Sequence, residues 1–229
     1  MATTDVPTEE VTKQVEELQV EEGGGGVSPT VLRSTEDFSV THPLSHRWTL
    51  WYTKPSTGQS GEDWKDLLKQ IVTVSTVEEF WGAFNSIPKI EELQLKSDYS
   101  FFKDGIRPEW EDPHNGKGGR LMYVISNKTR NQPPGPDGQK PVTGDEAWLK
   151  VLLGVIGGTL DNDKEIINGI FINVRKMGIR VNIWIADTKP QDQIRNIGQR
   201  FKELLRLNPK DEIEFSPHDS AYKADQFFV

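Results

Sequence analysis

Short runs of β-branched and aromatic residues recur from residue 47 to the C-terminal region, and they constrain the fold more than any other feature of this sequence. Such runs are typical of β-strands. They outnumber the segments with helical spacing, and most successive runs are placed to pair as antiparallel neighbours. We expect strands over residues 47–53, 70–75, 98–102, 120–126, 166–175, 178–186 and 211–216.

Three segments have the apolar spacing of helices. Residues 76–79 read Thr-Val-Glu-Glu, a capping-box pattern that predicts a helix start. Asp145 is expected to cap a helix over residues 145–158, and Pro190 stands near the first turn of a helix over residues 190–207. Together with the strands, these helices predict an α+β fold in which one curved antiparallel sheet carries helices on one face.

The first 38 residues differ from the rest of the chain. They contain few large apolar residues, four consecutive glycines at 23–26 and an excess of acids, which predicts a disordered acidic tail. A short amphipathic helix over residues 11–20 is the alternative for this segment. The folded domain is expected over residues 39–229, and residues 131–144 are expected to form a long surface loop rich in proline and glycine.

The charge distribution limits the partners of this domain. The chain has a formal net charge of −8, but residues 1–40 carry nine acids against two bases, and the remaining 26 acids and 25 bases nearly cancel. A near-neutral domain lacks the broad basic surface that binding along a nucleic-acid backbone requires. A small pocket with a few local arginines is compatible with this balance.

Other features of composition exclude several classes of protein. No cysteine is present, which excludes disulfides, a thiol nucleophile and thiolate metal sites. The four histidines have no metal-ligand spacing, so we expect no metal. No apolar run approaches 18 residues, and the N-terminus lacks the apolar core of a secretory signal. These features predict a soluble protein of the cytoplasm or nucleus with no membrane partner.

Three tryptophans stand out because their surroundings give a core tryptophan little reason to be there. Trp64 and Trp110 lie in polar segments without an apolar period, so both are expected on loops, and Glu111 places a carboxylate beside the second ring. Trp184 ends a strand and shares one face with Arg180, because side chains alternate along a strand. Aromatic faces, one acid and nearby arginines suit a planar cationic group that carries phosphates, which describes a modified nucleotide.

The helix expected over residues 145–158 has more apolar surface than one buried stripe requires. Trp148 and the apolar residues after it form the stripe that faces the sheet, whereas Leu149, Leu153 and Gly157 fall on another side. The helix that begins at residue 76 is similarly rich in aromatic residues. Exposed apolar patches of this kind are typical of a partner site, and complete burial of both helices is the alternative.

Several segments together resemble one protein family. HPLSHRWTLWYTK, TVEEFWGAFN, DYSFFKDGIRPEWEDPHNGKGGR, and INVRK with IRVNIWIAD are similar, in this order, to eukaryotic translation initiation factor 4E, which binds the cap of messenger RNA. The resemblance runs from about His42 to Val229, the whole domain without the tail. It implies a cupped sheet of eight antiparallel strands backed by three helices on its convex face. It also implies a monomeric translation initiation factor with no catalytic residues and no cofactor.

The resemblance implies the ligand and its contacts as well. The ligand is the 7-methylguanosine triphosphate cap, whose cationic base would stack between Trp64 and Trp110. Glu111 would accept hydrogen bonds from N1 and N2 of the base, the backbone N–H of Trp110 would donate to O6, and Trp184 would pack against the N7 methyl group. The phosphate contacts would come from Arg175, Arg180, Arg120 and Lys223.

The family also binds a partner helix on the surface opposite the cap. That helix carries a tyrosine-x4-leucine-hydrophobic motif and belongs to the scaffold initiation factor 4G or to the 4E-binding proteins. One departure is Lys150, where the family usually has an acid, so a salt bridge to the partner would be lost at a cost of about 0–1 kcal/mol. The matching residues are His42, Pro43, Val77, Trp81, Leu149, Lys150, Leu153 and Gly157.

Three alternatives to an initiation factor can be weighed. Cap-binding repressor homologues often have other aromatic residues in place of Trp48 and Trp64, which this chain retains. A cap hydrolase needs several carboxylates on one helix face to hold magnesium, and residues 108–112 (PEWED) are expected on a loop. A pure peptide-binding module leaves the tryptophans in polar segments unexplained. An initiation factor accounts for all of these features.

Overall fold

The computed structural model describes residues 40–58, 64–130, 140–162, 165–219 and 224–229. The chain divides into two units, Met1–Val40 and Thr41–Val229, and the second unit contains the sheet and its helices. The predicted tail and residues 131–139 of the predicted loop lie outside the described residues.

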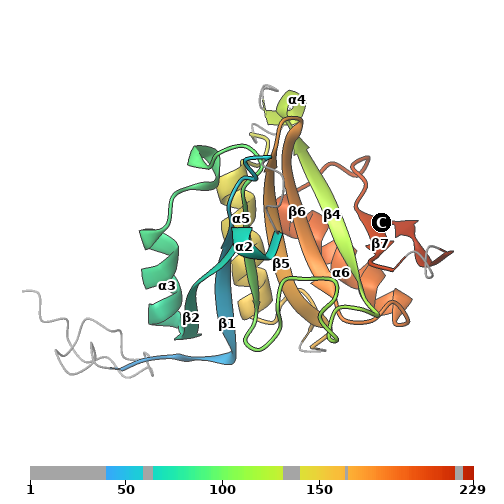
Figure 1. The fold of residues 1–229 in the computed structure, drawn as a ribbon. Coiled ribbons are helices and arrows are strands. Elements are labelled where there is room, and N and C mark those ends of the chain that lie inside the picture. Colours follow the sequence, from blue (N-terminus) through green and yellow to red (C-terminus); the bar gives the residue numbers. More distant parts are fainter. Residues whose placement is uncertain (1–39, 59–63, 131–139, 163–164, 220–223) are drawn as a thin grey trace, which may run out of the picture. The chain divides into compact units, whose positions relative to one another are not determined.

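Eight strands form one antiparallel sheet in the order β2-β1-β3-β5-β6-β4-β7-β8 (Figure 1). Seven of them lie where the sequence predicts, which confirms the α+β fold with a curved antiparallel sheet. The eighth has only two residues and was not predicted from the residue pattern. The strands are β1 (Pro43–Thr53), β2 (Leu68–Thr76), β3 (Asp98–Lys103), β4 (Gly119–Ser126), β5 (Ile167–Arg175), β6 (Gly178–Ile185), β7 (Glu214–Pro217) and β8 (Phe227–Phe228).

Three longer helices pack on one face of this sheet, as predicted. They are α3 (Val77–Ser86), α5 (Gly144–Ile156) and α6 (Gln191–Leu205). The short helices α2 (Trp64–Leu67), η2 (Ile90–Glu92) and α4 (Asn127–Arg130) were not predicted. Among the described residues, no helix is long and apolar enough to cross a membrane.

Helix α5 begins differently from the prediction. The side chain of Thr143, and not Asp145, caps the helix by accepting a hydrogen bond from the backbone N–H of Glu146 at 3.2 Å. Asp145 instead accepts from the backbone N–H of Ile90 at 2.6 Å. The sequence could not indicate this, because the competing donor lies 55 positions away in η2.

The start of α3 follows the predicted pattern in part. Thr76 accepts from the backbone N–H of Glu79 at 3.1 Å, as an N-cap should. The carboxylate of Glu79 accepts from the backbone N–H of Ser75 at 2.7 Å, one residue before the donor that a capping box uses. The helix start is therefore confirmed, with a shifted return hydrogen bond.

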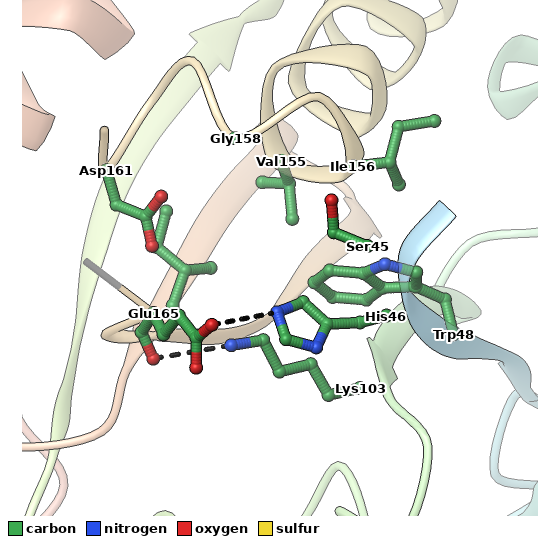
Figure 2. Close-up of a pocket in the computed structure, with 10 residues that line it drawn as sticks. Ser45, His46, Trp48, Lys103, Val155, Ile156, Gly158, Asp161 and Glu165 are labelled. Atoms are coloured by element: carbon green, nitrogen blue, oxygen red, sulfur yellow. Dashed lines mark hydrogen bonds and ion pairs between the residues drawn. The ribbon is translucent and has the colours of Figure 1, made fainter. Parts of the chain in front are cut away.

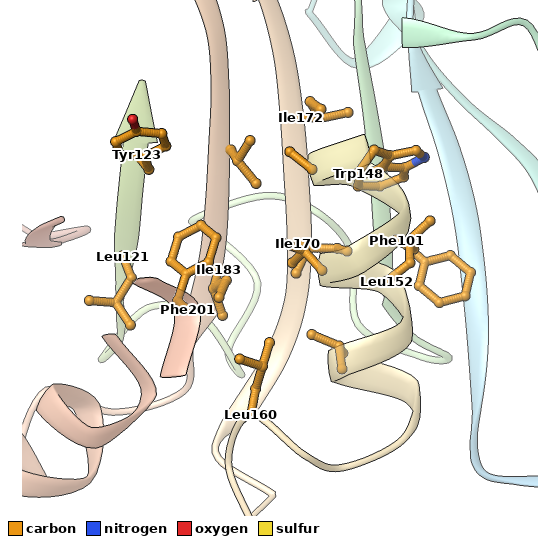
Figure 3. Close-up of a cluster of buried hydrophobic side chains, with 14 of the residues drawn as sticks. Phe101, Leu121, Tyr123, Trp148, Leu152, Leu160, Ile170, Ile172, Ile183 and Phe201 are labelled. Carbon is orange, nitrogen blue, oxygen red and sulfur yellow. The ribbon is translucent and has the colours of Figure 1, made fainter. Parts of the chain in front are cut away.

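The main core lies between the three helices and one face of the sheet (Figure 3). From α5, Trp148 and Leu152 are buried against Phe101 of β3 and Ile170 of β5. From α6, Phe201 is fully buried in the same cluster. Because side chains alternate along each strand, these inward residues leave their neighbours in sequence on the opposite face.

A second, smaller apolar cluster lies on that opposite face. It consists of Phe102, Ile106, Phe171 and Trp184. Trp184 stands opposite Gly169 in the register of β5 and β6. A Cβ atom at Gly169 would come within 2.3 Å of the ring of Phe102, so glycine is required for this close packing. This cluster forms the base of the candidate site.

Candidate functional site

Trp110 stands out from a loop that the chain holds in place. Its side chain is 60% exposed, although it belongs to the largest class of apolar side chains. Beneath it, the buried amide of Asn115 donates to the backbone oxygen of Arg107 at 2.9 Å and to that of Glu109 at 2.8 Å. The loop conformation predicted for Trp110 is confirmed, and these hydrogen bonds hold the backbone just before Trp110.

The same loop is tied to the sheet. The side-chain amide of Asn168, in β5, donates to the backbone oxygen of His114 at 2.7 Å and to Asn115 Oδ1 at 2.9 Å. At the other end of the loop, Asp112 accepts from the backbone N–H of Arg107 at 2.9 Å. Burial opposes ionisation of Asp112, but hydrogen bonds from Arg107 and His114 outweigh it and lower the pKa of this carboxyl. The carboxylate therefore stays charged and holds the loop.

Two further residues are predicted for base recognition, one within this loop and one in helix α2 earlier in the chain. Glu111 follows Trp110 directly and is exposed, so its carboxylate is available to a ligand. Trp64 is the first residue of α2 and does not lie on an irregular loop, so that part of the prediction was wrong. The side chain of Trp64 lies outside the described part of the chain.

The structure also differs from the expectation that Trp184 lies outside the core. The residue lies at the end of β6, as predicted, but it is only 8% exposed and belongs to the second apolar cluster. Its ring centroid lies 5.0 Å from that of Phe171, 5.4 Å from that of Phe102 and 4.0 Å from that of His218. The tryptophan is thus a core residue of this face of the sheet.

Arg175 is positioned by a carboxylate that sequence reasoning missed. Its guanidinium donates to both oxygens of Asp98, at 2.5 and 3.1 Å, and to the backbone oxygen of Val174 at 3.0 Å. The carboxylate of Asp98 is largely buried, whereas the Arg175 side chain keeps 32% of its surface exposed. The pair fixes the direction of the arginine and neutralises much of its charge.

Arg180 and Arg120 lie on the same face of the sheet as Trp184. In the register of β4 and β6, Arg120 pairs with Trp184 and Arg180 pairs with Val124. Burial lowers the pKa of Arg120, and the positive charge of Arg180 lowers it further, whereas Glu214 acts in the opposite direction. Two cations therefore lie within electrostatic reach of each other beside Trp184. Lys223 lies outside the described residues.

The residues predicted for partner binding gather on the helical side of the molecule. The backbone N–H of Val77, the first residue of α3, donates to the backbone oxygen of His42 at 2.9 Å, and Pro43 pairs with Thr76. His42 Nδ1 lies 2.7 Å from a carboxylate oxygen of Glu78. The backbone N–H of His42 also donates to the Glu78 carboxylate at 2.9 Å, and these two contacts with His42 lower the pKa of Glu78 to about 2.

Helices α3 and α5 supply the rest of this surface. Trp81 of α3 is 36% exposed and Leu153 of α5 is 39% exposed, although both are large apolar residues. Leu149 is half-buried and Gly157 is exposed at the end of α5. Lys150 forms an ion pair with Glu146 at 2.6 Å, one helical turn away, so its charge already has a partner within the chain. We call these residues, with His42, Pro43 and Val77, the dorsal surface.

Two cavities border the dorsal surface. One, of about 500 Å³, lies between Phe84 and Ile87 on one side and Trp148 and Leu149 of α5 on the other. The second, of about 200 Å³, lies beneath the C-terminal end of α5 and is lined by polar and apolar residues in similar proportion (Figure 2).

In the second cavity, Lys103 donates to the backbone oxygen of Glu165 at 3.3 Å, and His46 lies 3.6 Å from its carboxylate. None of the predicted site residues lines it. Across the described ranges, no group of three or more histidine or acidic side chains is arranged to hold a metal ion.

Comparison with known proteins identifies the family. The family model described as eukaryotic initiation factor 4E matches residues 43–228. The chain belongs to the eukaryotic initiation factor 4E family. A curated member, eukaryotic translation initiation factor 4E of Candida albicans, is 44% identical over 214 residues, which cover 93% of this chain and 94% of that protein.

Two solved members of the initiation factor 4E family share the fold. Initiation factor 4E-3 of Ascaris suum, in complex with an m7G cap, superimposes with a TM-score of 0.69 at 36% identity over 79% of this chain and 93% of its own. Initiation factor 4E-3 of C. elegans, in complex with the 4E-binding protein Mextli and a cap analogue, gives 0.70 at 31% identity over 83% of this chain and 100% of its own. Both likenesses confirm the curved antiparallel sheet with its helices.

Proposed function

We propose that this protein is a translation initiation factor that binds the 7-methylguanosine triphosphate cap of messenger RNA. The observation that carries the proposal is an exposed indole, Trp110, held on a loop tied to the sheet, with an exposed carboxylate at Glu111 beside it. A tryptophan that is 60% exposed buries little of its apolar surface in the domain. It suits a planar ligand that is cationic and donates hydrogen bonds.

In this proposal the base lies between Trp110 and Trp64. Methylation at N7 gives the guanine a positive charge, so cation–π attraction of about 2 kcal/mol adds to stacking of about 1–3 kcal/mol per base. Glu111 accepts from N1 and N2, the backbone N–H of Trp110 donates to O6, and the methyl group contacts the edge of Trp184. None of these contacts makes or breaks a bond, and we propose that the protein is not an enzyme.

The phosphates are assigned to the arginines on the same face. Asp98 already holds Arg175 in one orientation, so little side-chain entropy is lost when a phosphate binds to its free edge. Arg180 and Arg120 supply the second and third cations, and Lys223 a fourth from the C-terminal region. These residues would give a near-neutral domain a local group of cations where the triphosphate is expected.

The dorsal surface is assigned to a partner helix with a tyrosine-x4-leucine-hydrophobic motif, from scaffold initiation factor 4G or from 4E-binding proteins. The exposed apolar residues Trp81 and Leu153 support this assignment, since they lie on neighbouring helices on the side opposite the cap site. Lys150 is neutralised by Glu146, so a basic residue in the partner meets a paired lysine and not an isolated charge. We place the protein in the cytoplasm, acting as a monomer.

The proposal is tested by the affinity for the charged base. 7-Methyl-GTP should quench the intrinsic tryptophan fluorescence, and GTP should bind at least about tenfold more weakly because only the methylated ring gives a desolvated cation to the two indoles. Both nucleotides carry the same triphosphate, so GTP controls for the phosphate contacts. Equal affinity for the two nucleotides would contradict the stacking of a cationic base.

The arginine assignment gives a second test. Arg180→Ala should weaken binding of 7-methyl-GTP by about tenfold and leave binding of 7-methylguanosine unchanged, with a smaller dependence of affinity on salt. Arg180 is exposed, and no ion pair to it occurs within the described ranges, so its removal leaves the fold intact. Arg175→Ala is a poorer test, because Asp98 would lose its partner at a cost of about 1–3 kcal/mol of stability. A parallel loss for the nucleoside and the triphosphate would show that Arg180 does not contact phosphate.

A further inference from the structure

The turn between β5 and β6 lies at the end of the sheet toward which the proposed phosphate contacts lead. Trp184 and Arg180 share one face of β6, and Arg180 lies nearer the turn by about 13 Å along the strand. Arg175, the last residue of β5, pairs with Gly178 across the turn. In the proposed cap site, a triphosphate that passes from Trp184 to these two arginines therefore runs toward residues 176 and 177.

Three exposed lysines gather at this end of the sheet. Lys176 lies in the turn, and its backbone oxygen accepts from the side-chain amide of Asn127 at 2.9 Å, which places Lys128 of α4 beside the turn (Figure 1). Lys96 lies just before β3, and its backbone N–H donates to the backbone oxygen of Val174 at 2.9 Å. The ion pairs found within the described residues include none of the three lysines. We call these lysines the basic end.

We propose that the basic end binds the phosphates of the messenger RNA that follow the cap. The inference rests on the proposed cap binding and extends it, because a capped RNA continues beyond the triphosphate as a polyanion. A chain that keeps the direction set by Arg180 and Arg175 brings its next phosphates to Lys176 and Lys128. Phosphate contacts carry no sequence information, so the basic end accepts any RNA sequence.

The basic end is too small to bind RNA without the cap. Three lysines match only a few phosphates, and the nearly neutral domain offers uncapped RNA no broad basic surface. Once the cap is bound, the following phosphates are held near the turn at a high local concentration, so weak contacts add to the affinity. Met177 is 75% exposed in the same turn and adds no charge to it.

The first test removes two of the lysines. Lys128→Ala combined with Lys176→Ala should weaken binding of a short capped RNA by about fivefold and reduce its salt dependence, because two contacts with phosphate are lost. Binding of 7-methyl-GTP should not change, since its phosphates end at the arginines. The matched control is Lys189→Ala combined with Lys202→Ala, which changes the net charge equally, beyond the other end of β6 and on α6. Fluorescence titrations at several salt concentrations give the affinities.

A gain of affinity provides a second measurement, which damage to the fold cannot imitate. Met177→Lys adds a cation to the turn and should tighten binding of the capped RNA by about twofold, without changing that of 7-methyl-GTP.

Three results would overturn the inference. The double lysine variant and its control could bind the capped RNA equally well, the double lysine variant could lose 7-methyl-GTP in parallel, or Met177→Lys could give no gain. An uncapped RNA of the same sequence that bound the wild type as tightly as the capped one would contradict the proposed function itself, which is a different result.

Discussion

Replacing Trp110 with alanine should lower the affinity for 7-methyl-GTP by roughly 100-fold, because the loss combines stacking on the base with a cation–π contact. The indole is 60% exposed and makes no ring contact within the described structure, so the melting temperature should change little. Isothermal calorimetry measures the affinity, and thermal unfolding provides the stability control.

Two companion variants sharpen this test. Trp110→Phe keeps an aromatic face and should recover part of the affinity, whereas Leu95→Ala removes an apolar side chain that is 57% exposed and lies outside both proposed surfaces. Leu95→Ala should bind 7-methyl-GTP as the wild type does. A Trp110→Ala protein that kept its affinity would remove this residue from the base-binding site.

Replacing Trp81 with alanine should weaken binding of a tyrosine-x4-leucine peptide by roughly 30-fold or more, since a tryptophan buried in an interface commonly contributes about 2 kcal/mol or more. Its ring centroid lies 5.2 Å from that of Phe80 and 5.8 Å from that of Phe84, so some loss of stability is also expected. Binding of 7-methyl-GTP should remain close to that of the wild type.

The two tryptophan variants and the two ligands give four affinities. Trp110→Ala should keep the peptide and lose the nucleotide, and Trp81→Ala should do the reverse. A folded Trp81→Ala protein that retained the peptide would refute the assignment of the dorsal surface. If one variant lost affinity for both ligands, the fold would be damaged. Circular dichroism of each variant tests for such damage.

The sequence predicted the sheet well because the alternation of inward and outward side chains and the β-branched composition persist over five or more residues in most strands. It predicted α3, α5 and α6 for the corresponding reason, since each spans at least ten residues. The two-residue β8 and the single-turn helices α2 and α4 are too short to have a period. Tertiary contacts determine whether such short elements form, and these contacts cannot be derived from the local residue pattern.

Within the candidate site, the sequence could identify a residue only where its side chain differs in polarity from the segment around it. Trp110 and Glu111 stand in a polar segment, and that contrast alone marks an indole that is not in the core. For Trp184 the alternation along RVNIW predicted its face, but not that Phe102 and Phe171 cover that face. Burial of this kind depends on residues from two other strands.

The residues that support the site were not predicted at all. Asp98 lies 77 positions from Arg175, and Asn115 lies 53 positions from Asn168. A single acid or amide has no local signal that identifies a partner so far away. The resemblance to the family supplied the residues that we propose contact the ligand, whereas the structure supplied those that hold them in place.

The hydrogen bonds that join Asn115 and Asn168 have a kinetic consequence. They fix the loop of Trp110 before any ligand arrives, so the free energy of ordering this loop is part of folding and not of binding. Encounter with the base at this half of the site then requires no rearrangement, and association rates should be similar for caps with different bases. Caps with different bases should therefore differ in affinity mainly through their dissociation rates, as related ligands of a preformed site commonly do.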